Sequence, residues 1–393
     1  MTRSSETRAA GATTGRIVYL IQGTEVSGAE RMHTALMRDD RDPLVICPLG
    51  GSSEQFAREV GARIEPLAFR PLRHSGGLLE GLRSILRGLR TAIEVRGILK
   101  RHPDRRIVFC TSIRPGMLAA IAALGLRRRL LWCVPDFLPP RPLRGIVRFM
   151  IVRTAHAALC LSEVIADDLC GASRRLRQLT VVVHPGVDPD RFDPTASDPA
   201  APRAALVGHI SHVKRTDLAV QIAALVRERD PRFELRVVGR AQFREEDFAL
   251  ERELHARAQD DPSLRSAVEF AGFAANVGEA LAGCGLLLHT RPDEPFGIVM
   301  IEAMAMGLPV VAPRAAGPLE IVVDGQTGLF YPPEDAAGGA AAVLELLADP
   351  ERARRMGAAA RARVERHFTV SRQLAQTREL LADHADAVGG VRT

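Results

Sequence analysis

Short apolar runs alternate with longer amphipathic segments along nearly the whole chain. Strands that alternate with helices are typical of parallel sheets, so the pattern predicts an α/β fold. A clear helical pattern covers residues 78–99, where leucine and isoleucine form one stripe and arginine forms another. The runs that predict strands are 16–21, 43–49, 106–111, 130–134, 157–162 and 179–183, followed by 204–210, 234–239, 268–273, 285–290 and 308–313.

The alternation is interrupted at residues 184–204, which are rich in proline and aspartate. This composition predicts a domain boundary within the stretch. We therefore expect a flexible tail over 1–15, a first Rossmann-like domain over 16–190, a second over 200–370, and a last helix over 371–393. Two doubly wound sheets that face each other would form a cleft at the carboxyl ends of their strands, where ligands bind in this architecture.

Composition excludes several classes of protein. Hydrophobic residues make up 46% of the chain, charged residues 25%, and mean hydropathy is +0.01, as in a soluble globular protein. The run at 115–126 is too short to span a bilayer, and the polar N-terminus lacks the apolar segment of a signal peptide, so we expect a cytoplasmic protein. The chain also lacks G-x-G-x-x-G and Walker A motifs, which argues against a dehydrogenase or a P-loop NTPase.

Charge is distributed unevenly. Residues 70–153 contain 18 basic and 4 acidic side chains, which favours an anionic substrate or surface. Solvated helix faces in an arginine-rich chain explain the same excess equally well, because only Lys100 and Lys214 are lysines. The six cysteines have no metal-ligand spacing, and we expect reduced core thiols and no metal site.

The stretch DEPFGIVMIEAMAMGLPVVAP, residues 293–313, carries the most chemical information. Pro295 and Gly297 allow a tight turn, and the helix that follows offers free backbone N–H groups to a diphosphate. That helix is apolar on every side except at Glu302, about 8 Å beyond Gly297 along the axis. A buried carboxylate needs a partner, either the hydroxyls of a bound ligand or an internal arginine or backbone N–H.

These residues resemble the E-x7-E signature of the retaining glycosyltransferase family 4, which has the GT-B fold and uses nucleotide-diphosphate sugars. Three other stretches are similar to motifs of that family and extend the resemblance from about residue 17 to the C-terminus. They are VSGAERMHTAL, VVVHPGVDPDRF and GPLEIVVDGQTGLF. The resemblance implies that the first domain binds the acceptor, that the second binds the nucleotide sugar, and that the last helix crosses back to the first domain.

The resemblance implies roles for matching residues in the second domain. Glu302 would bind the nucleotide ribose and Glu294 the donor sugar, while the backbone of Phe296, Gly297 and Ile298 would contact the diphosphate and sugar. The stretch VGHISHVKRTDL, residues 207–218, contains Gly208 and resembles the family's diphosphate-binding loop. Within it, Lys214 matches the lysine that clamps the diphosphate. His209 stands where the family has arginine and Arg215 where it has glycine, so either side chain is a candidate for the second phosphate contact.

In the first domain, Gly28 matches a loop where a side chain would block the approach of a phosphate or acceptor. Asp136 matches an acceptor-orienting aspartate, although Pro135 replaces the adjoining histidine and a plain turn residue fits as well. The basic segment 141–153 fits either a helix at a membrane surface or, more commonly, a packed helix with solvated arginines.

The implied activity is transfer of a sugar, with retention, from a UDP or GDP sugar to an acceptor hydroxyl. Glu294, Lys214 and Asp136 are the candidate catalytic residues, and we expect no divalent metal, because lysine and helix dipole supply its electrostatic role. The acceptor would be a cyclitol, another small natural product, or a lipid-linked or cell-envelope precursor. We expect no nucleic-acid partner and leave weak membrane-surface association open. A nucleotide-sugar epimerase and a non-catalytic nucleotide-sugar-binding protein are the alternatives.

Overall fold

The computed structural model describes residues 16–24, 28–68, 78–242 and 244–386. The chain divides into two compact units, one formed by residues 1–184 and 374–393 and the other by residues 185–373. The last helix, α17 (Val370–Asp386), starts in the second unit and continues in the first, where Arg378 forms an ion pair with Asp39. The tail expected at residues 1–15 lies outside the described residues.

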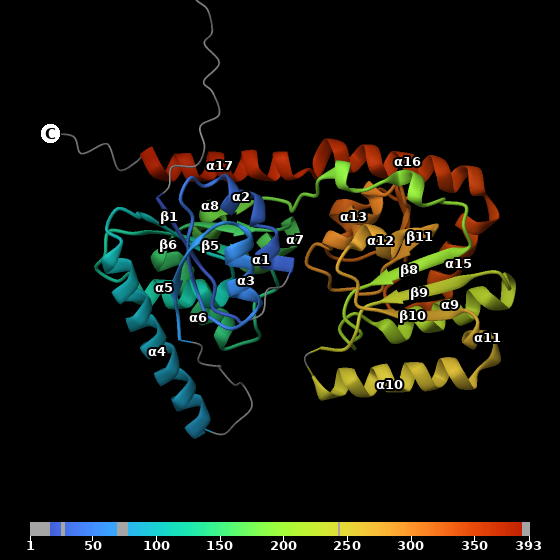
Figure 1. The fold of residues 1–393 in the computed structure, drawn as a ribbon, viewed down its shortest axis with the longest axis horizontal. Coiled ribbons are helices and arrows are strands. Elements are labelled where there is room, and N and C mark those ends of the chain that lie inside the picture. Colours follow the sequence, from blue (N-terminus) through green and yellow to red (C-terminus); the bar gives the residue numbers. More distant parts are fainter. Residues whose placement is uncertain (1–15, 25–27, 69–77, 243, 387–393) are drawn as a thin grey trace, which may run out of the picture. The chain divides into compact units, whose positions relative to one another are not determined.

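The first unit contains a seven-stranded parallel sheet in the order β3-β2-β1-β4-β5-β6-β7 (Figure 1). Its strands are β1 (Ile17–Leu20), β2 (Leu44–Cys47), β3 (Arg63–Pro66), β4 (Ile107–Cys110), β5 (Arg129–Val134), β6 (Ala155–Cys160) and β7 (Thr180–Val182). The pattern predicted all of these except β3, an edge strand whose four residues are exposed or half-buried and therefore show no apolar run.

The second unit contains a six-stranded parallel sheet in the order β10-β9-β8-β11-β12-β13. Its strands are β8 (Arg203–Val207), β9 (Glu234–Val238), β10 (Val268–Gly272), β11 (Leu286–Leu288), β12 (Val310–Pro313) and β13 (Gly328–Tyr331). Here too the edge strand β13 was missed by the predicted runs, while the other five were found. The α/β fold class is thus confirmed in both units.

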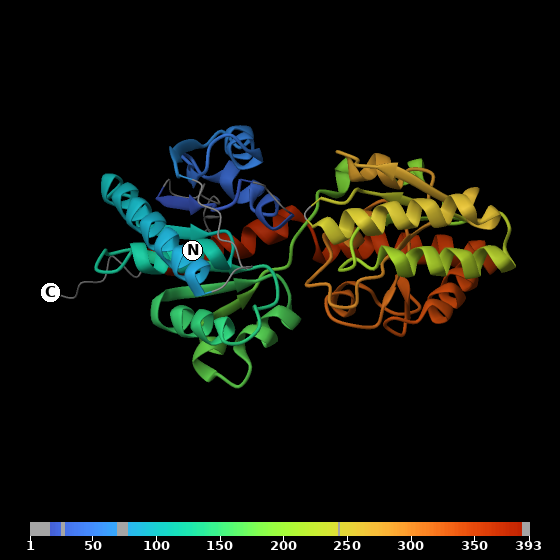
Figure 2. The same ribbon diagram turned by 90° about the horizontal axis from the view of Figure 1, so that it is seen from below.

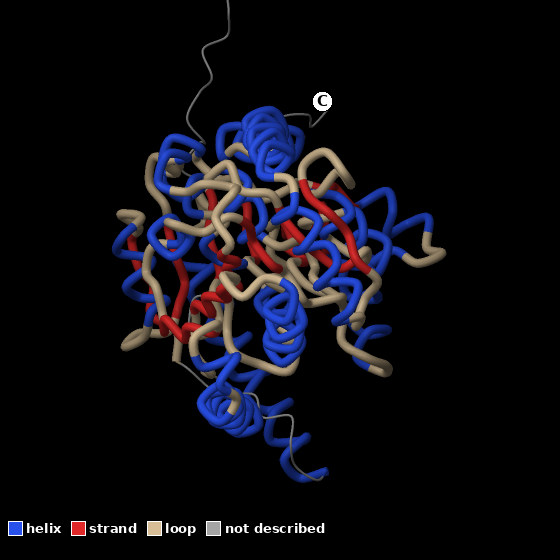
Figure 3. The backbone as a smooth tube through the Cα atoms, turned by 90° about the vertical axis from the view of Figure 1, so that its right-hand side faces the viewer, coloured by secondary structure: helices blue, strands red, loops and turns tan. Residues whose placement is uncertain are grey.

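Helices flank the strands of both sheets (Figure 3). In the second unit α9 and α10 pack against each other, and Figure 2 shows them side by side in yellow-green and yellow. The first unit has α1 (Gly28–Arg31), α2 (Thr34–Asp39), α3 (Ser52–Glu59), α4 (Leu78–Arg101), α5 (Ile113–Ala122), α6 (Leu143–Thr154), α7 (Glu163–Cys170) and α8 (Arg174–Leu179). The second has α9 (Thr216–Arg229), α10 (Glu245–Asp260), α11 (Pro262–Arg265), α12 (Val277–Leu281), α13 (Ile298–Ala305), α14 (Pro318–Ile321), α15 (Ala336–Ala348) and α16 (Pro350–His367), with short 3-10 turns at Pro189–Arg191 and Pro194–Ala196.

Burial explains why the strands read as continuous apolar runs. Strands β1, β2 and β4 are buried at every position, because helices cover both faces of a parallel sheet. Packing is tight where helix meets sheet: a side chain at Gly116 in α5 would lie 2.4 Å from the buried Trp132 in β5. All six cysteines are free and buried, as expected of core thiols. Of the helices described, none is long and apolar enough to cross a membrane.

Each sheet has one point where the strand order reverses, between β1 and β4 in the first unit and between β8 and β11 in the second. The loops at the carboxyl ends of such a strand pair diverge to opposite faces and leave a crevice between them. In the second unit these loops carry Gly208 to Arg215 after β8 and His289 to Gly297 after β11. Most of the residues predicted for donor binding therefore lie at one reversal point.

Candidate functional site

The loops after β8 and β11 bring Lys214 and Glu294 together. The Nζ atom of Lys214 donates a hydrogen bond of 2.7 Å to Oε2 of Glu294, although the residues are 80 positions apart in the sequence. The glutamate side chain is buried, while that of the lysine keeps 27% of its surface exposed. One ammonium N–H is thus used by Glu294, and a lysine has three.

Two further basic side chains surround Glu294. Nε2 of His289 lies 3.5 Å from its Oε2 and Nη1 of Arg291 lies 4.0 Å from its Oε1. Burial acts most strongly on Glu294 and would raise its pKa, but Lys214, His289 and Arg291 together outweigh burial, so the pKa lies below the usual value. Burial lowers the pKa of His289 to about 4, so its imidazole is neutral at pH 7. The cluster therefore contains a carboxylate with a cation beside it and a neutral imidazole.

Hydrogen bonds to the backbone hold the two loops in place. The backbone N–H of Lys214 donates to Oγ of Ser211 at 3.1 Å, and the Thr290 hydroxyl donates to the Lys214 carbonyl at 2.8 Å. From β13, the buried Tyr331 hydroxyl donates to the carbonyl of His289 at 2.8 Å. Because Thr290 and His289 precede Glu294 on the same loop, these bonds fix the position of the lysine relative to the carboxylate.

The turn before α13 has a conformation that requires glycine. Gly297 has φ +103°, and a Cβ atom there would lie 2.2 Å from Cε of Met300 and 3.2 Å from Cγ of Glu294. The preceding Phe296 is buried and packs edge-on against Phe368 at 5.9 Å between ring centroids. Ile298, half-buried, starts the helix. The helix start is thus held directly beside the Lys214–Glu294 pair.

A second segment supports this turn from behind. The backbone N–H of Gly317 donates to the carbonyl of Glu294 at 2.9 Å, and a Cβ atom at Gly317 would lie 2.6 Å from Cα of Phe296. The GPLE stretch therefore touches the backbone that positions Glu294.

Replacing Gly317 by alanine is expected to lower the free energy of unfolding by about 1–3 kcal/mol, because backbone atoms must move to admit the methyl group. Chemical denaturation measures the change. The matched control is Gly97→Ala in α4, where a Cβ atom would meet no atom within 4 Å. Alanine favours helices, so this control is expected to be neutral or slightly stabilising. Equal stabilities of the two variants would contradict the close contact at Gly317.

Glu302 lies on the second turn of α13 and is partly buried. Among the residues that the structure describes, none forms a hydrogen bond or an ion pair with its carboxylate. Burial raises its pKa to about 7, and only the charge of Arg191 opposes the shift. Of the two explanations left open by the sequence, an internal partner is therefore not observed within the described residues, and the carboxylate remains available to a ligand.

His209 and Arg215 occupy the loop after β8 in different ways. His209 is among the exposed residues, although other atoms screen part of its ring from water. This desolvation and the positive charge of Lys214 lower the pKa of the imidazole. The guanidinium of Arg215 forms ion pairs with Asp217 and Glu334. Its backbone has φ +52°, a left-handed conformation, which explains on steric grounds why glycine suits this position. Gly208, with φ +150°, lies beneath the side chain of Lys214.

The other two predicted residues belong to the first unit. Gly28 is the first residue of α1, which follows β1, and Asp136 comes after the last residue of β5. Asp136 is exposed, and its Oδ1 accepts a hydrogen bond of 2.8 Å from the backbone N–H of Phe137, as in a turn. Both lie at carboxyl ends of strands in their own sheet.

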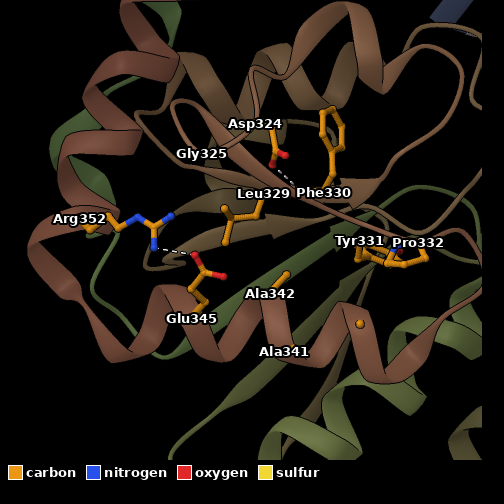
Figure 4. Close-up of a pocket in the computed structure, with 11 residues that line it drawn as sticks. Asp324, Gly325, Leu329, Phe330, Tyr331, Pro332, Ala341, Ala342, Glu345 and Arg352 are labelled. Carbon is orange, nitrogen blue, oxygen red and sulfur yellow. Dashed lines mark hydrogen bonds and ion pairs between the residues drawn. The ribbon is translucent and has the colours of Figure 1, made fainter.

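A hollow of about 440 Å³ lies elsewhere in the second unit, between β13 and α15 (Figure 4). Its lining includes the ion pair of Arg352 with Glu345, and it contains none of the predicted donor-binding residues. Tyr331 links this hollow to the site, because it lines the hollow and bonds to His289. Over the described part of the chain, no group of three or more His, Cys, Asp or Glu side chains is arranged to hold a metal ion.

Three residues of the site were not predicted. His289, Thr290 and Arg291 directly follow β11 in the run LLLHTRPDEP, and their polarity next to a buried strand was the available signal. Their packing on Lys214 and Glu294 depends on the neighbouring strand β8, which the sequence places far away.

Known proteins resemble this chain in sequence and in structure. A family model described as glycosyl transferases group 1 matches residues 189–363. Glycogen synthase of Mycobacterium tuberculosis is 32% identical over 233 residues, 56% of this chain and 53% of that protein. D-inositol 3-phosphate glycosyltransferase of Streptomyces bingchenggensis is 29% identical over 65% of this chain and 58% of its own length. The chain thus spans little more than half the length of these relatives.

Solved structures match over almost the whole chain. HepE of Anabaena, crystallised with UDP-glucose, has a TM-score of 0.79 at 23% identity, covering 93% of this chain and 99% of that one. Sucrose-phosphate synthase of Thermosynechococcus elongatus has a TM-score of 0.73 at 19% identity, covering 94% and 99%. At these identities the likeness shows the fold, which is GT-B. Residues 189–363, which make up most of the second unit, are thus similar to the group 1 glycosyl transferases.

Proposed function

We propose that this chain transfers a sugar from a nucleotide-diphosphate sugar to an acceptor hydroxyl, with retention of anomeric configuration. The observation that carries the proposal is the 2.7 Å contact of Lys214 with the buried Glu294, beside the start of α13 and at the reversal point of the second sheet. A cation, free N–H groups and a carboxylate in one place suit the phosphates and hydroxyls of such a donor.

The leaving group receives most of the stabilisation. As the bond between the anomeric carbon and the β-phosphate oxygen breaks, negative charge grows on that phosphate. The ammonium of Lys214 and the backbone N–H groups after Gly297 would hold this charge more tightly in the transition state than in the ground state. The leaving phosphate oxygen takes the proton of the attacking acceptor hydroxyl. Lys214 and the dipole of α13 would stabilise the negative charge on the leaving phosphate without a divalent metal.

The carboxylates would orient the donor at its two ends. Glu294 would accept hydrogen bonds from the sugar, and Glu302 from the ribose of the nucleotide. Support for Glu302 comes from its partly buried carboxylate with a raised pKa and no internal partner among the described residues. Asp136 would orient the acceptor from the first unit, and Gly28 would leave space for it.

A UDP sugar is the first donor to test, since HepE was crystallised with UDP-glucose, and a GDP sugar is the second. The acceptor would be a cyclitol or other small natural product, or a lipid-linked or cell-envelope precursor. The relative named as a D-inositol 3-phosphate glycosyltransferase supports the first class. Action on a lipid-linked acceptor would place the enzyme at the inner face of a membrane.

Thermal-shift measurements with UDP, GDP, ADP and dTDP sugars test the donor. A ligand that binds only the folded state stabilises it by about 2.7 kcal/mol at a concentration 100 times its Kd, so one nucleotide class is expected to raise Tm. Incubation of that donor with candidate acceptors should then release the nucleoside diphosphate and form an α-linked product from an α-linked donor.

Other results would redirect the assignment. A new sugar nucleotide formed from donor alone would indicate an epimerase. Binding without turnover of any acceptor would favour a non-catalytic binding protein, and no shift with any sugar nucleotide would contradict the donor site itself.

A further inference from the structure

Helix α4 exposes an apolar stripe that the proposed transfer does not use. Five aliphatic side chains between residues 82 and 93 have exposed fractions between 42% and 68%. We call them the apolar arm: Leu82, Ile85, Leu86, Leu89 and Ile93. In the second half of the same helix, Ala92, Val95 and Leu99 are at most 1% exposed and pack into the core of the first unit. Figure 1 shows the start of α4 projecting beyond the sheet of that unit.

Helix geometry shows that the arm faces away from the unit. Successive residues turn by about 100°, which places the centre of the stripe roughly 110° from the face formed by Ala92, Val95 and Leu99. Where that inner face continues toward the helix start, it carries Gly81 and Gly88, and a Cβ atom at either would meet nothing within 4 Å. The described part of the unit therefore does not cover the first half of α4.

The surroundings of the arm are basic. Arg83, Arg87 and Arg90 form the row next to the stripe, and residues 70–153 hold 18 basic against 4 acidic side chains. Of the acidic residues on this helix, Glu80 is paired with Arg83 and Arg87, and Glu94 accepts a hydrogen bond from the backbone N–H of Ala68. An apolar stripe flanked by arginines combines the two attractions that hold a helix on a bilayer surface.

We propose that the apolar arm docks on an anionic phospholipid bilayer, with its aliphatic side chains at the acyl boundary and the arginine row at the headgroups. Charge decides between this occupant and a second copy of the chain, because pairing two arms would bring two arginine rows together. The basic segment 141–153 is less suited, since α6 exposes two large apolar side chains, Ile146 and Phe149, against five on the arm, and its Arg148 donates to the carbonyl of Asp168. The inference does not depend on glycosyl transfer.

Co-sedimentation of the full chain with vesicles, without donor or acceptor, tests the proposal. Vesicles of phosphatidylcholine mixed with phosphatidylglycerol are expected to bind the protein, more weakly as salt increases, whereas phosphatidylcholine alone is expected to bind it far less. The double variant Ile85→Ser, Leu89→Ser should lower the partition coefficient on anionic vesicles by roughly tenfold or more. Both side chains are exposed, so folding should be retained, and circular dichroism checks it.

The matched control is Phe248→Ser, Phe273→Ser, which removes two exposed apolar side chains from the second unit. It should leave vesicle binding unchanged. Equal binding of the arm variant and the parent, or equal binding to neutral and anionic vesicles, would overturn the proposal. So would concentration-dependent dimerisation of the parent in sedimentation velocity that the arm variant abolishes, because a second copy would then be the occupant.

Discussion

Replacing Lys214 by alanine is expected to lower kcat of the proposed transfer by about 10²–10³-fold, the usual effect of removing one preorganised donor to a developing oxyanion. The reason is position: its Nζ lies 2.7 Å from Glu294, next to the start of α13 where the β-phosphate would bind. Steady-state kinetics with the identified donor measure the loss. The KM for the acceptor should change little, because the lysine acts on the leaving group.

The second lysine of the chain provides a matched control for this experiment. Lys100, the other lysine, is exposed at the end of α4, and Lys100→Ala should keep full activity. Lys214→Arg retains the charge but changes its geometry, so partial recovery is expected. Because Lys214→Ala leaves the buried Glu294 with one cation fewer, its unfolding should be measured in parallel. A folded Lys214→Ala variant with parental kcat would refute the proposed role.

Replacing Glu302 by glutamine is expected to stabilise the ligand-free protein while weakening its affinity for the donor. The pKa of this carboxyl is raised by burial from 4.5 to about 7, so the folded state binds its proton more tightly than the unfolded state does. The parent therefore loses stability as pH rises from about 4.5 to about 7 and carries the full cost above that range, at most about 3 kcal/mol. Glutamine removes the ionisation and with it the cost.

Urea unfolding of both proteins at pH 4.5 and pH 8 tests this expectation. The gain from Glu302→Gln should be near zero at the acidic pH and largest at the basic pH. Calorimetry should show donor affinity reduced by roughly 10–100-fold, the loss of hydrogen bonds to a charged group. The control is Glu251→Gln, at a half-buried glutamate in α10, which should show neither effect. A gain independent of pH, or unchanged nucleotide affinity, would contradict the role given to Glu302.

These two variants separate the parts of the hypothesis. The Lys214→Ala variant tests the chemical step, and its affinity for the nucleotide should remain measurable. Glu302 concerns recognition of the donor, and its loss should appear in affinity before turnover. A destabilising carboxylate kept in order to bind the donor would illustrate the usual conflict between stability and function.

The sequence by itself determined the α/β class, the interior strands of both sheets, the long helices and the stretch around Glu294 and Glu302. This was possible because a parallel sheet buried on both faces demands continuous apolar runs, and a buried helix makes a single acid conspicuous. Strand β3 escaped because its four residues are exposed or half-buried and form no apolar run. Strand β13 escaped because its apolar run, residues 329–331, is only three residues long, although three of the four strand residues are buried.

Only the tertiary structure decided which side chains meet. The order of β8 beside β11 brings Lys214 to Glu294 and surrounds that carboxylate with His289 and Arg291, and no local pattern encodes a contact across 80 residues. It likewise decided that the stripe on α4 faces outward, although its periodicity alone is that of a helix packed on a core. Periodicity records that one face is apolar, whereas its partner depends on how the whole chain packs.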